Sequence, residues 1–304
     1  MVPMAATELA PGRHFAGLRI ERLIGRGANG AVYAVTDPAA GEGPQAWRAL
    51  KLLAPQGGDA GDDAAAEAAE AADRLAREAA TLQRLVHPGI VRVHRAGGTQ
   101  GRPWLLMELL GGVDLTRYTR PARLLPEPVV ARIGERLARA LAHAHARGVV
   151  HRDLKPANVV VDWAADRIVL TDFGLAAVAG AERTRTGLVL GSPAFMAPEL
   201  LAGAPPDAQT DLYALGVLLY QLLTGELPFD APALGELLRR IAADPAPDPA
   251  ARSPGVPARL AGLVRGLLAK SPSARPPHAL AVADTLAALR SGDAPAARGD
   301  ASTA

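Results

Sequence analysis

The 304-residue sequence contains no cysteine, which excludes disulfide bonds and thiolate chemistry. Aromatic residues make up only 4%, so a hydrophobic core must be built mainly from leucine, valine and alanine. No apolar run reaches the roughly 18 to 20 residues that a membrane span needs, and the longest one covers residues 212–223. Residues 1–18 also lack the apolar stretch of a signal peptide. We therefore expect a cytoplasmic protein with no membrane span.

The sequence also has no block of charge of one sign. The net charge is +2, and acidic and basic residues are mixed along the chain, without the basic cluster that a nucleic-acid surface needs. We therefore expect no nucleic-acid partner. Lysine is scarce, at Lys51, Lys155 and Lys270 against thirty arginines, and asparagine occurs only at Asn29 and Asn158. The positions that keep these rare residues are candidates for chemistry.

The first third of the sequence has the alternating apolar pattern of β-strands. One predicted helix interrupts it at residues 72–86, and a proline and a glycine at residues 88–89 end that helix. The predicted strands span residues 18–24, 31–35, 46–53, 90–93 and 104–110.

Beyond a predicted hinge at Gly111-Gly112, apolar residues recur mostly at helical spacing. The fold class is therefore α+β, with a small antiparallel sheet and one main helix followed by a larger, mainly helical part. We expect a leader at residues 1–14, two lobes at residues 15–110 and 111–290, and a disordered tail at residues 291–304. In the second lobe, the predicted helices span residues 126–147, 209–224, 232–243, 256–269 and 277–290, and two short strands span residues 159–161 and 168–170.

Three glycines, Gly25, Gly27 and Gly30, lie between the first two predicted strands. Glycine lets the backbone approach a phosphate closely, although the same pattern also fits a plain hairpin turn or a Rossmann turn. A Rossmann turn would open a helix, whereas here a second strand follows and a third leads to Lys51. The pattern favours a flap over a nucleotide, with Lys51 holding the α- and β-phosphates and Glu78, on the next helix, orienting that lysine.

The motif with the most specific chemistry is HRDLKPAN at residues 151–158, which DFG at residues 172–174 follows. Phosphoryl transfer needs a carboxylate that accepts the proton of the attacking hydroxyl, oxygen ligands that hold Mg²⁺, and a cation beside the transferred group. The candidates are Asp153 for the proton, Asn158 and Asp172 for the metal, and Lys155 for the charge.

These motifs resemble those of the protein kinase superfamily, and in particular those of the bacterial "eukaryotic-like" serine/threonine kinases. The resemblance runs from about residue 15 to about residue 290. It implies the bilobal kinase fold, with ATP and Mg²⁺ (or Mn²⁺) as cofactors and proteins as substrates. Lys155 in the catalytic motif and GSPAF at residues 191–195 are typical of the serine/threonine enzymes rather than of tyrosine kinases.

The resemblance assigns further residues of the nucleotide site. Residues 104–110 look like the fifth strand and the hinge, with Met107 as the gatekeeper. The backbone of Glu108 and Leu110 would bond to adenine. The remaining members are Val32, Ala49 and Val160, which would sandwich the adenine ring, and Asp114, which would reach the ribose.

Supporting residues follow from the same resemblance. Asp211 would hold the catalytic loop from a helix, and Arg275 would pair with Glu199 of the motif APE at residues 197–199. A stacked apolar spine would link the two lobes. Its members would be Leu82, Val93, His151 and Phe173.

Regulation is expected in the segment that follows DFG. The resemblance implies autophosphorylation of Thr184 or Thr186, whose phosphate would pair with Arg152 and order the loop, and it allows a homodimer for that reaction. A surface loop whose threonines do nothing is the alternative. Two positions depart from the family pattern: Ala177 stands where many relatives have a basic residue, and Ser192 replaces a threonine but keeps its hydroxyl.

Two other functions fit part of the pattern. A nucleotide-binding scaffold without activity would have lost Lys51, Asp153 or Asp172, and all three are present. A small-molecule phosphotransferase with the same fold would lack the peptide-docking segment that residues 192–199 supply. An active serine/threonine protein kinase accounts for every position considered.

Overall fold

The structure is a computed structural model, and it describes residues 9–27, 30–53, 79–99, 102–173 and 193–291. The chain forms two compact units, residues 1–113 with 160–190 and residues 114–159 with 191–304. Several expectations concern residues outside the described ranges. They are the roles of Glu78, Thr184, Thr186, Ala177 and Ser192, most of the leader and nearly all of the tail.

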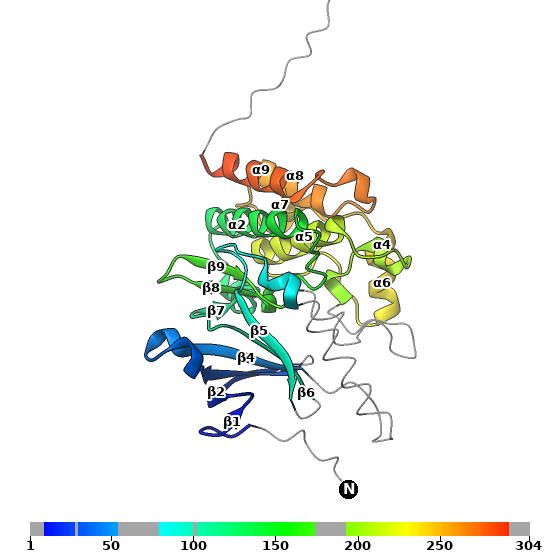
Figure 1. Cartoon of the computed structure of the whole chain (residues 1–304). Helices are drawn as coiled ribbons and strands as arrows, with labels where there is room; N and C mark the ends of the chain where they lie inside the picture. The colour runs from blue at the N-terminus through cyan, green and yellow to red at the C-terminus, as the bar shows by residue number, and fades with distance from the viewer. Residues whose placement is uncertain (1–8, 28–29, 54–78, 100–101, 174–192, 292–304) are drawn as a thin grey trace, which may run out of the picture. The chain divides into compact units, whose positions relative to one another are not determined.

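The first unit contains a six-stranded sheet in which every pairing is antiparallel (Figure 1). The strand order is β1-β2-β3-β4-β6-β5, so β1 and β5 are the edges. In the inner strand β4, residues 49–53 are all buried, and all of them except Lys51 are apolar. The strands are β1 His14–Phe15, β2 Leu18–Gly27, β3 Gly30–Thr36, β4 Trp47–Leu53, β5 Val93–Thr99 and β6 Arg102–Glu108.

The two faces of this sheet differ. One face carries an apolar cluster to which Leu50 and Leu52 of β4 contribute. Successive side chains of a strand point to opposite faces, so Ala49 and Lys51 face the other way. The strands therefore place Lys51 on the face that the cluster leaves free. The cluster comprises Phe15, Leu18, Ile20, Tyr33, Val35, Leu50, Leu52, Trp104 and Leu106.

One strand was predicted wrongly. The apolar run at residues 90–93 is not the strand itself, because β5 begins at Val93 and ends at Thr99. Ile90 instead forms an isolated parallel bridge with Leu170. The sequence of β5 is polar and contains two glycines, which an edge strand tolerates because only one side is paired. Of the predicted helix at 72–86, the structure describes helical residues 79–83.

A second sheet has three short strands in the order β7-β8-β9. Its strands are β7 Val113–Asp114, β8 Val159–Asp162 and β9 Arg167–Leu170. The division into units groups residues 160–190, which include β9, with the six-stranded sheet. The main-chain N–H of Val91 donates to Leu170 O (2.9 Å), and that of Leu170 donates to Gly89 O (2.9 Å). These bonds explain why a segment so distant in sequence belongs to the first unit.

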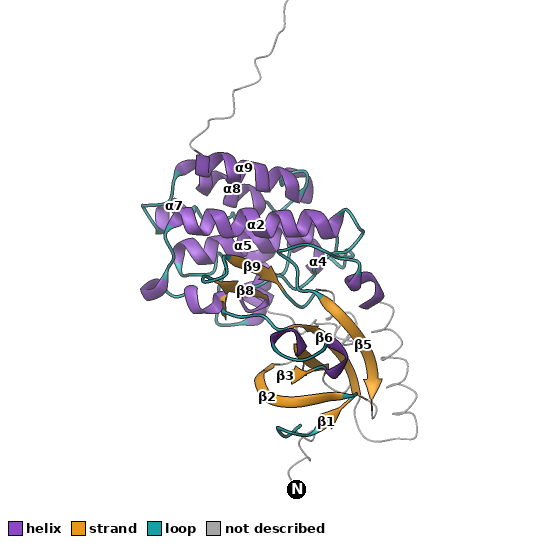
Figure 2. Cartoon of the chain, turned by 60° about the vertical axis from the view of Figure 1, so that its left-hand side comes forward, coloured by secondary structure: helices purple, strands orange, loops and turns teal. Residues whose placement is uncertain are grey.

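The second unit is mainly helical, and α5 is buried on nearly all sides. Asp207 caps the start of α5, because its side chain accepts from the N–H groups of Gln209 and Thr210. Helices α2 and α9 lie side by side (Figures 1 and 2). Among the described residues, none of the helices combines the length and the apolar character of a membrane span. The helices are α2 Glu127–His145, α4 Pro198–Leu201, α5 Ala208–Thr224, α6 Leu234–Ala243, α7 Pro249–Arg252, α8 Ala258–Leu267 and α9 Ala279–Ser291.

Short 3-10 turns connect these elements. The turn η5 begins at Pro156 and lies inside the catalytic motif, and η3 begins directly after Asp114. The full set is η1 Pro38–Ala40, η2 Pro44–Ala46, η3 Leu115–Tyr118, η4 Pro121–Arg123, η5 Pro156–Asn158, η6 Pro193–Phe195 and η7 Pro272–Ala274.

Candidate active site

The first unit holds a buried ion pair between two of the predicted residues. Nζ of Lys51 lies 2.7 Å from Oδ2 of Asp172, and the Lys51 side chain is only 5% exposed. A lysine buried this deeply needs a charged or polar partner. The sequence motifs predict a phosphate role for Lys51 and a metal role for Asp172, but they do not predict this ion pair. Nothing local signals the contact, because the two residues lie far apart in the chain.

Strand register brings the expected adenine residues to the face that carries Lys51. Directly paired residues of antiparallel strands share a face. Val32 pairs with Lys51 across β3 and β4, and Ala49 pairs with Met107 across β4 and β6. Val32, Ala49 and Met107 therefore lie on one side of the sheet, with Lys51.

The glycine segment is built for close approach at Gly30. Its φ is +126°, and a Cβ added there would lie 1.9 Å from the carbonyl oxygen of Leu52. Only glycine avoids that collision. Among the described residues, no atom lies within 4 Å of a Cβ added at Gly25 or Gly27, at the end of β2, so there is room for a ligand on their side of the strand.

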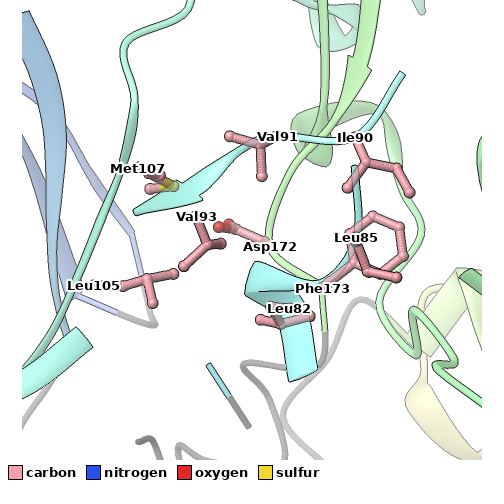
Figure 3. A pocket seen from close by; sticks show the side chains of 9 residues that line it. All are labelled: Leu82, Leu85, Ile90, Val91, Val93, Leu105, Met107, Asp172 and Phe173. Carbon is pink, nitrogen blue, oxygen red and sulfur yellow. The ribbon is translucent and has the colours of Figure 1, made fainter. Parts of the chain in front are cut away.

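A pocket of the first unit joins Asp172 to the sheet (Figure 3). Figure 3 shows apolar side chains of residues 82–93 and of strand β6 converging on the pocket, with Phe173 next to Asp172. Leu82, Val93 and Phe173, three members of the expected spine, line this pocket together with the gatekeeper candidate Met107. The complete lining is Leu82, Leu85, Ile90, Val91, Val93, Leu105, Met107, Asp172 and Phe173.

In the second unit, the catalytic motif folds into a compact cluster around Asp153. Nζ of Lys155 lies 2.6 Å from Oδ2 of Asp153. The amide nitrogen of Asn158 donates to the same oxygen (3.0 Å) and to the carbonyl oxygen of Asp153 (2.7 Å). The side chains of Asp153 and Lys155 are 16% and 20% exposed. Both donors use Oδ2, and within the described part of the chain neither reaches Oδ1.

A buried aspartate fixes the backbone of this loop. Asp211, 1% exposed in α5, accepts from the main-chain N–H groups of His151 (2.8 Å) and Arg152 (2.9 Å). The predicted support of the catalytic loop by Asp211 is confirmed. His145 Nε2, at the end of α2, lies 2.8 Å from the same carboxylate. The role of His145 could not be predicted from the sequence, because its partner is distant in the chain and no local motif marks this histidine.

Two of the site residues have strained backbones. Arg152 has a φ of +69° and Asp172 a φ of +62°, values that side chains with a Cβ rarely adopt. Such strain costs about 1–3 kcal/mol per residue and tends to occur at functional sites. The hydrogen bond from Arg152 N–H to Asp211 and the ion pair of Asp172 with Lys51 hold these residues in place.

A second predicted contact is present near α4. Arg275 makes a two-pronged ion pair with Glu199, with both N–O distances at 2.7 Å. The arginine side chain is fully buried and also donates to the carbonyl oxygens of Ala269 and Gln209. The predicted Arg275–Glu199 pair is confirmed. It ties the APE segment to the turn that follows α8.

Comparison with known proteins decides the family. Residues 18–286 match the family model described as the protein kinase domain. The chain belongs to the protein kinase family.

Named relatives agree with that assignment. Serine/threonine-protein kinase PknJ of Mycobacterium tuberculosis is 40% identical over 280 residues, which cover 89% of this chain and 45% of PknJ. Serine/threonine-protein kinase PkaB of Streptomyces coelicolor is 38% identical over 263 residues, which cover 84% of this chain and 58% of PkaB. The chain thus spans about half the length of the curated relatives that it matches.

Solved structures show the same fold. The crystal structure of the Mycobacterium tuberculosis PknI kinase domain matches with a TM-score of 0.71 and 34% sequence identity, covering 92% of this chain and 99% of that one. The expected class is confirmed: this kinase domain has the protein kinase fold, with an antiparallel sheet in one unit and a helical second unit.

The hinge residues of this kinase domain use their side chains for structure. Glu108 accepts from the main-chain N–H of Arg92 (2.9 Å) and pairs with Arg167 (3.0 Å). Asp114 caps η3, because its Oδ1 accepts from the N–H (3.0 Å) and the hydroxyl of Thr116. The predicted bond of the Glu108 backbone to adenine stays a prediction. The ribose contact of Asp114 stays a prediction.

Proposed function

We propose that this kinase domain transfers the γ-phosphate of ATP to serine or threonine hydroxyls of proteins. The observation that carries the proposal is the Asp153 cluster. A carboxylate whose Oδ2 is held by Lys155 and Asn158 keeps Oδ1 for the proton of an attacking hydroxyl. The names of the relatives, all serine/threonine-protein kinases, support the same activity.

Each residue of the cluster has a distinct role in this proposal. Asp153 orients the hydroxyl and accepts its proton as the hydroxyl oxygen bonds to the γ-phosphorus and the bond to the departing ADP breaks. Lys155 places a positive charge beside the transferred group, where negative charge accumulates. Asp211 acts at a distance, because it fixes the backbone from which Asp153 projects.

The first unit would bind the nucleotide. Lys51 would hold the α- and β-phosphates under the flap formed by Gly25, Gly27 and Gly30, and Glu78, outside the described residues, would orient that lysine. Adenine would lie among apolar side chains and bond to the hinge backbone. The residues of this adenine and ribose site would be Val32, Ala49, Val160, Met107, Glu108, Leu110 and Asp114.

The donor set fits a hard divalent cation, Mg²⁺ or Mn²⁺. Asp172 offers a carboxylate and Asn158 an amide oxygen, and oxygen ligands are the kind that Mg²⁺ prefers. The two bonds of the Asn158 amide nitrogen to Asp153 fix the orientation of the amide, and so of its oxygen. When bound, the metal would neutralise phosphate charge. Asn158 and Asp172 would hold it.

Regulation by autophosphorylation is part of the proposal. Thr184 and Thr186 lie outside the described residues, and the support comes from Arg152, which is exposed and follows the motif pattern for a phosphate partner. Ala177 removes one cation of the usual pocket, so Arg152 would carry more of the interaction. A homodimer would allow the reaction between copies.

A cytoplasmic location and the lobe boundaries at residues 15–110 and 111–290 are proposed on the sequence alone.

Label transfer from γ-³²P-ATP to a general protein substrate, followed by phosphoamino-acid analysis, tests the function. We expect phosphoserine and phosphothreonine with the unchanged chain and no label with Asp153→Asn. Label on tyrosine alone would overturn the specificity. Equal label with Asp153→Asn would overturn the role of the aspartate.

Mass spectrometry of the chain after incubation with ATP would locate any phosphate on Thr184 or Thr186. Unchanged activity of the double alanine variant would refute their regulatory role.

A further inference from the structure

The carboxylate of Glu108 is the most connected side chain of the hinge. Glu108 ends β6, and its main-chain N–H donates to Arg92 O (2.9 Å) while its Oε1 accepts from Arg92 N–H (2.9 Å). Nη2 of Arg167 lies 3.0 Å from Oε2 and 3.3 Å from Oε1. Both oxygens of the carboxylate are therefore engaged, one by the backbone of the loop before β5 and both by Arg167.

Arg167 belongs to a strand that is itself fixed. It opens β9, whose last residue, Leu170, exchanges two main-chain hydrogen bonds with the segment at residues 89–91. At the other end of β9, the side chain of Arg167 joins this strand to Glu108. The loop at residues 89–92, the hinge residue Glu108 and strand β9 thus form a closed ring of contacts.

The hinge is also held at its far end. Gly112 has a φ of +89°, and an added Cβ would lie 2.1 Å from the carbonyl oxygen of Val161. An added Cβ at Gly111 would lie 2.7 Å from the Asp162 carboxylate. The segment at residues 108–112 therefore lies against the β8–β9 hairpin at both ends. Close packing fixes the Gly111–Gly112 end, and the Arg167 ion pair fixes the Glu108 end.

We propose that Arg167 is a positioning residue for adenine recognition: it holds the side chain of Glu108 and so fixes the hinge backbone that bonds to the base. This inference rests on the proposed function. A hydrogen bond to a base depends on the direction of the carbonyl or N–H group, and a peptide free to rotate loses affinity on ordering. Since the Glu108 side chain is fully used by Arg92 and Arg167, its main chain is held in one orientation before the nucleotide arrives.

The alternative is an ion pair without consequence, which is common for exposed pairs. Arg167 is 40% exposed, but Glu108 is only 22% exposed and has the Arg92 N–H as a second donor. Loss of Arg167 leaves a half-buried carboxylate next to the hinge with one partner fewer. We therefore expect the loss of Arg167 to weaken binding of the adenine base more than it lowers the stability of the chain.

Adenosine is the probe that separates this role from phosphate binding, because it has no phosphate groups. We would measure adenosine and inorganic tripolyphosphate binding calorimetrically with the whole chain and with Arg167→Ala, Arg167→Gln and Arg167→Lys. We expect Arg167→Ala to weaken adenosine binding about three- to tenfold and to leave tripolyphosphate binding unchanged. Arg167→Lys, which keeps a charge, should recover part of the loss. The KM for ATP should rise by the same factor while kcat stays within about twofold.

Arg139→Ala is the matched control, because Arg139 is 42% exposed and lies 3.1 Å from a Glu135 carboxylate oxygen on α2. It should leave adenosine binding unchanged. Adenosine binding that is equal in the unchanged chain and in Arg167→Ala would overturn the inference alone, and so would an equal loss of adenosine and tripolyphosphate. No adenosine binding by the unchanged chain would overturn both the inference and the proposed function. Arg167→Gln, which keeps the length of the side chain, provides the same comparison if the alanine variant does not fold.

Discussion

The two charged clusters, one in each unit, are built in opposite ways. In the second unit, Asp153, Lys155 and Asn158 come from one loop of six residues, and the short spacing alone brings them together. In the first unit, Lys51 and Asp172 come from distant segments and meet only because β4 and the residues after β9 belong to the same compact unit. The lysine of the local cluster, Lys155, is 20% exposed, whereas Lys51 is only 5% exposed.

This difference has a physical consequence. A cluster formed within one loop keeps its geometry as long as the loop backbone is held, which is the task of Asp211. A pair formed between distant segments depends on the packing of everything between them. The first cluster should therefore respond to mutation mainly in catalysis, and the second in both nucleotide binding and stability.

The largest expected effect is on kcat, and ATP affinity then distinguishes the two clusters. Asp153→Asn should lower kcat by about 10²–10⁴-fold with ATP affinity nearly unchanged, because the amide cannot accept the proton. Lys51→Met should lower kcat to a similar extent and also weaken ATP binding, because it removes the cation that meets the phosphates. Steady-state kinetics together with calorimetric ATP binding would check both. Unchanged ATP affinity in Lys51→Met would show that the first cluster does not bind phosphate.

The next effect concerns the support of the local cluster. Asp211→Ala should lower the free energy of unfolding by about 3–5 kcal/mol, because it leaves the buried N–H of His151, the partly buried N–H of Arg152 and the His145 ring without their acceptor. Urea denaturation would measure it. Asp207→Ala, which removes an exposed cap from the same helix, is the control and should cost about 1 kcal/mol. If both variants lose the same free energy of unfolding, the three bonds to Asp211 stabilise the chain no more than the Asp207 helix cap does.

The same contrast explains what the sequence could predict. The catalytic loop follows from its own residues, because HRDLKPAN spans only a few positions and each role needs a particular side chain. The long helices are also predictable, since a run such as residues 209–224 has the apolar spacing of a buried helix. The Lys51–Asp172 pair, the His145–Asp211 bond and the Arg167–Glu108 pair are not predictable, because each joins residues that no local pattern connects. Strand β5 was misplaced for a related reason, since its polar sequence is set by its edge position.

A double-mutant cycle would sharpen the comparison for the distant pair. We expect Lys51→Met and Asp172→Asn to show a coupling of about 1–3 kcal/mol in the free energy of unfolding, less than for a fully buried pair because Asp172 is 23% exposed. Denaturant unfolding of the unchanged chain, the two single variants and the double variant gives the coupling. The matched cycle with Lys155→Met and Asp153→Asn, in which the lysine is 20% exposed against 5% for Lys51, should give less than about 1 kcal/mol. A larger coupling for the loop pair would reverse the proposed distinction.

Lys270 completes the contrast, because within the described residues it has no carboxylate at ion-pair distance, unlike Lys51 and Lys155. Its Nζ donates to the carbonyl oxygens of Ile241 (2.5 Å) and Arg240 (3.3 Å), at the end of α6, and lies 3.8 Å from the centre of the Phe229 ring. Burial lowers the pKa of Lys270 from 10.5 to about 8, with Arg275 adding to the shift and Asp244 opposing it. Desolvation thus destabilises the ammonium form of Lys270 in the folded chain.

The smallest expected effect follows from this lowered pKa. Between pH 8 and pH 10.5 the unfolded chain keeps the Lys270 proton while the folded chain releases it, so the free energy of unfolding should rise with pH through this group. Below pH 8 both states are protonated, and the desolvation cost is fully present. Lys270→Met removes the titrating group, so the stability of the unchanged chain relative to this variant should increase from pH 8 to pH 10.5. Urea unfolding of both proteins at several pH values would measure it, and parallel curves would show that the α6 carbonyls and the Phe229 ring compensate the ammonium for its burial.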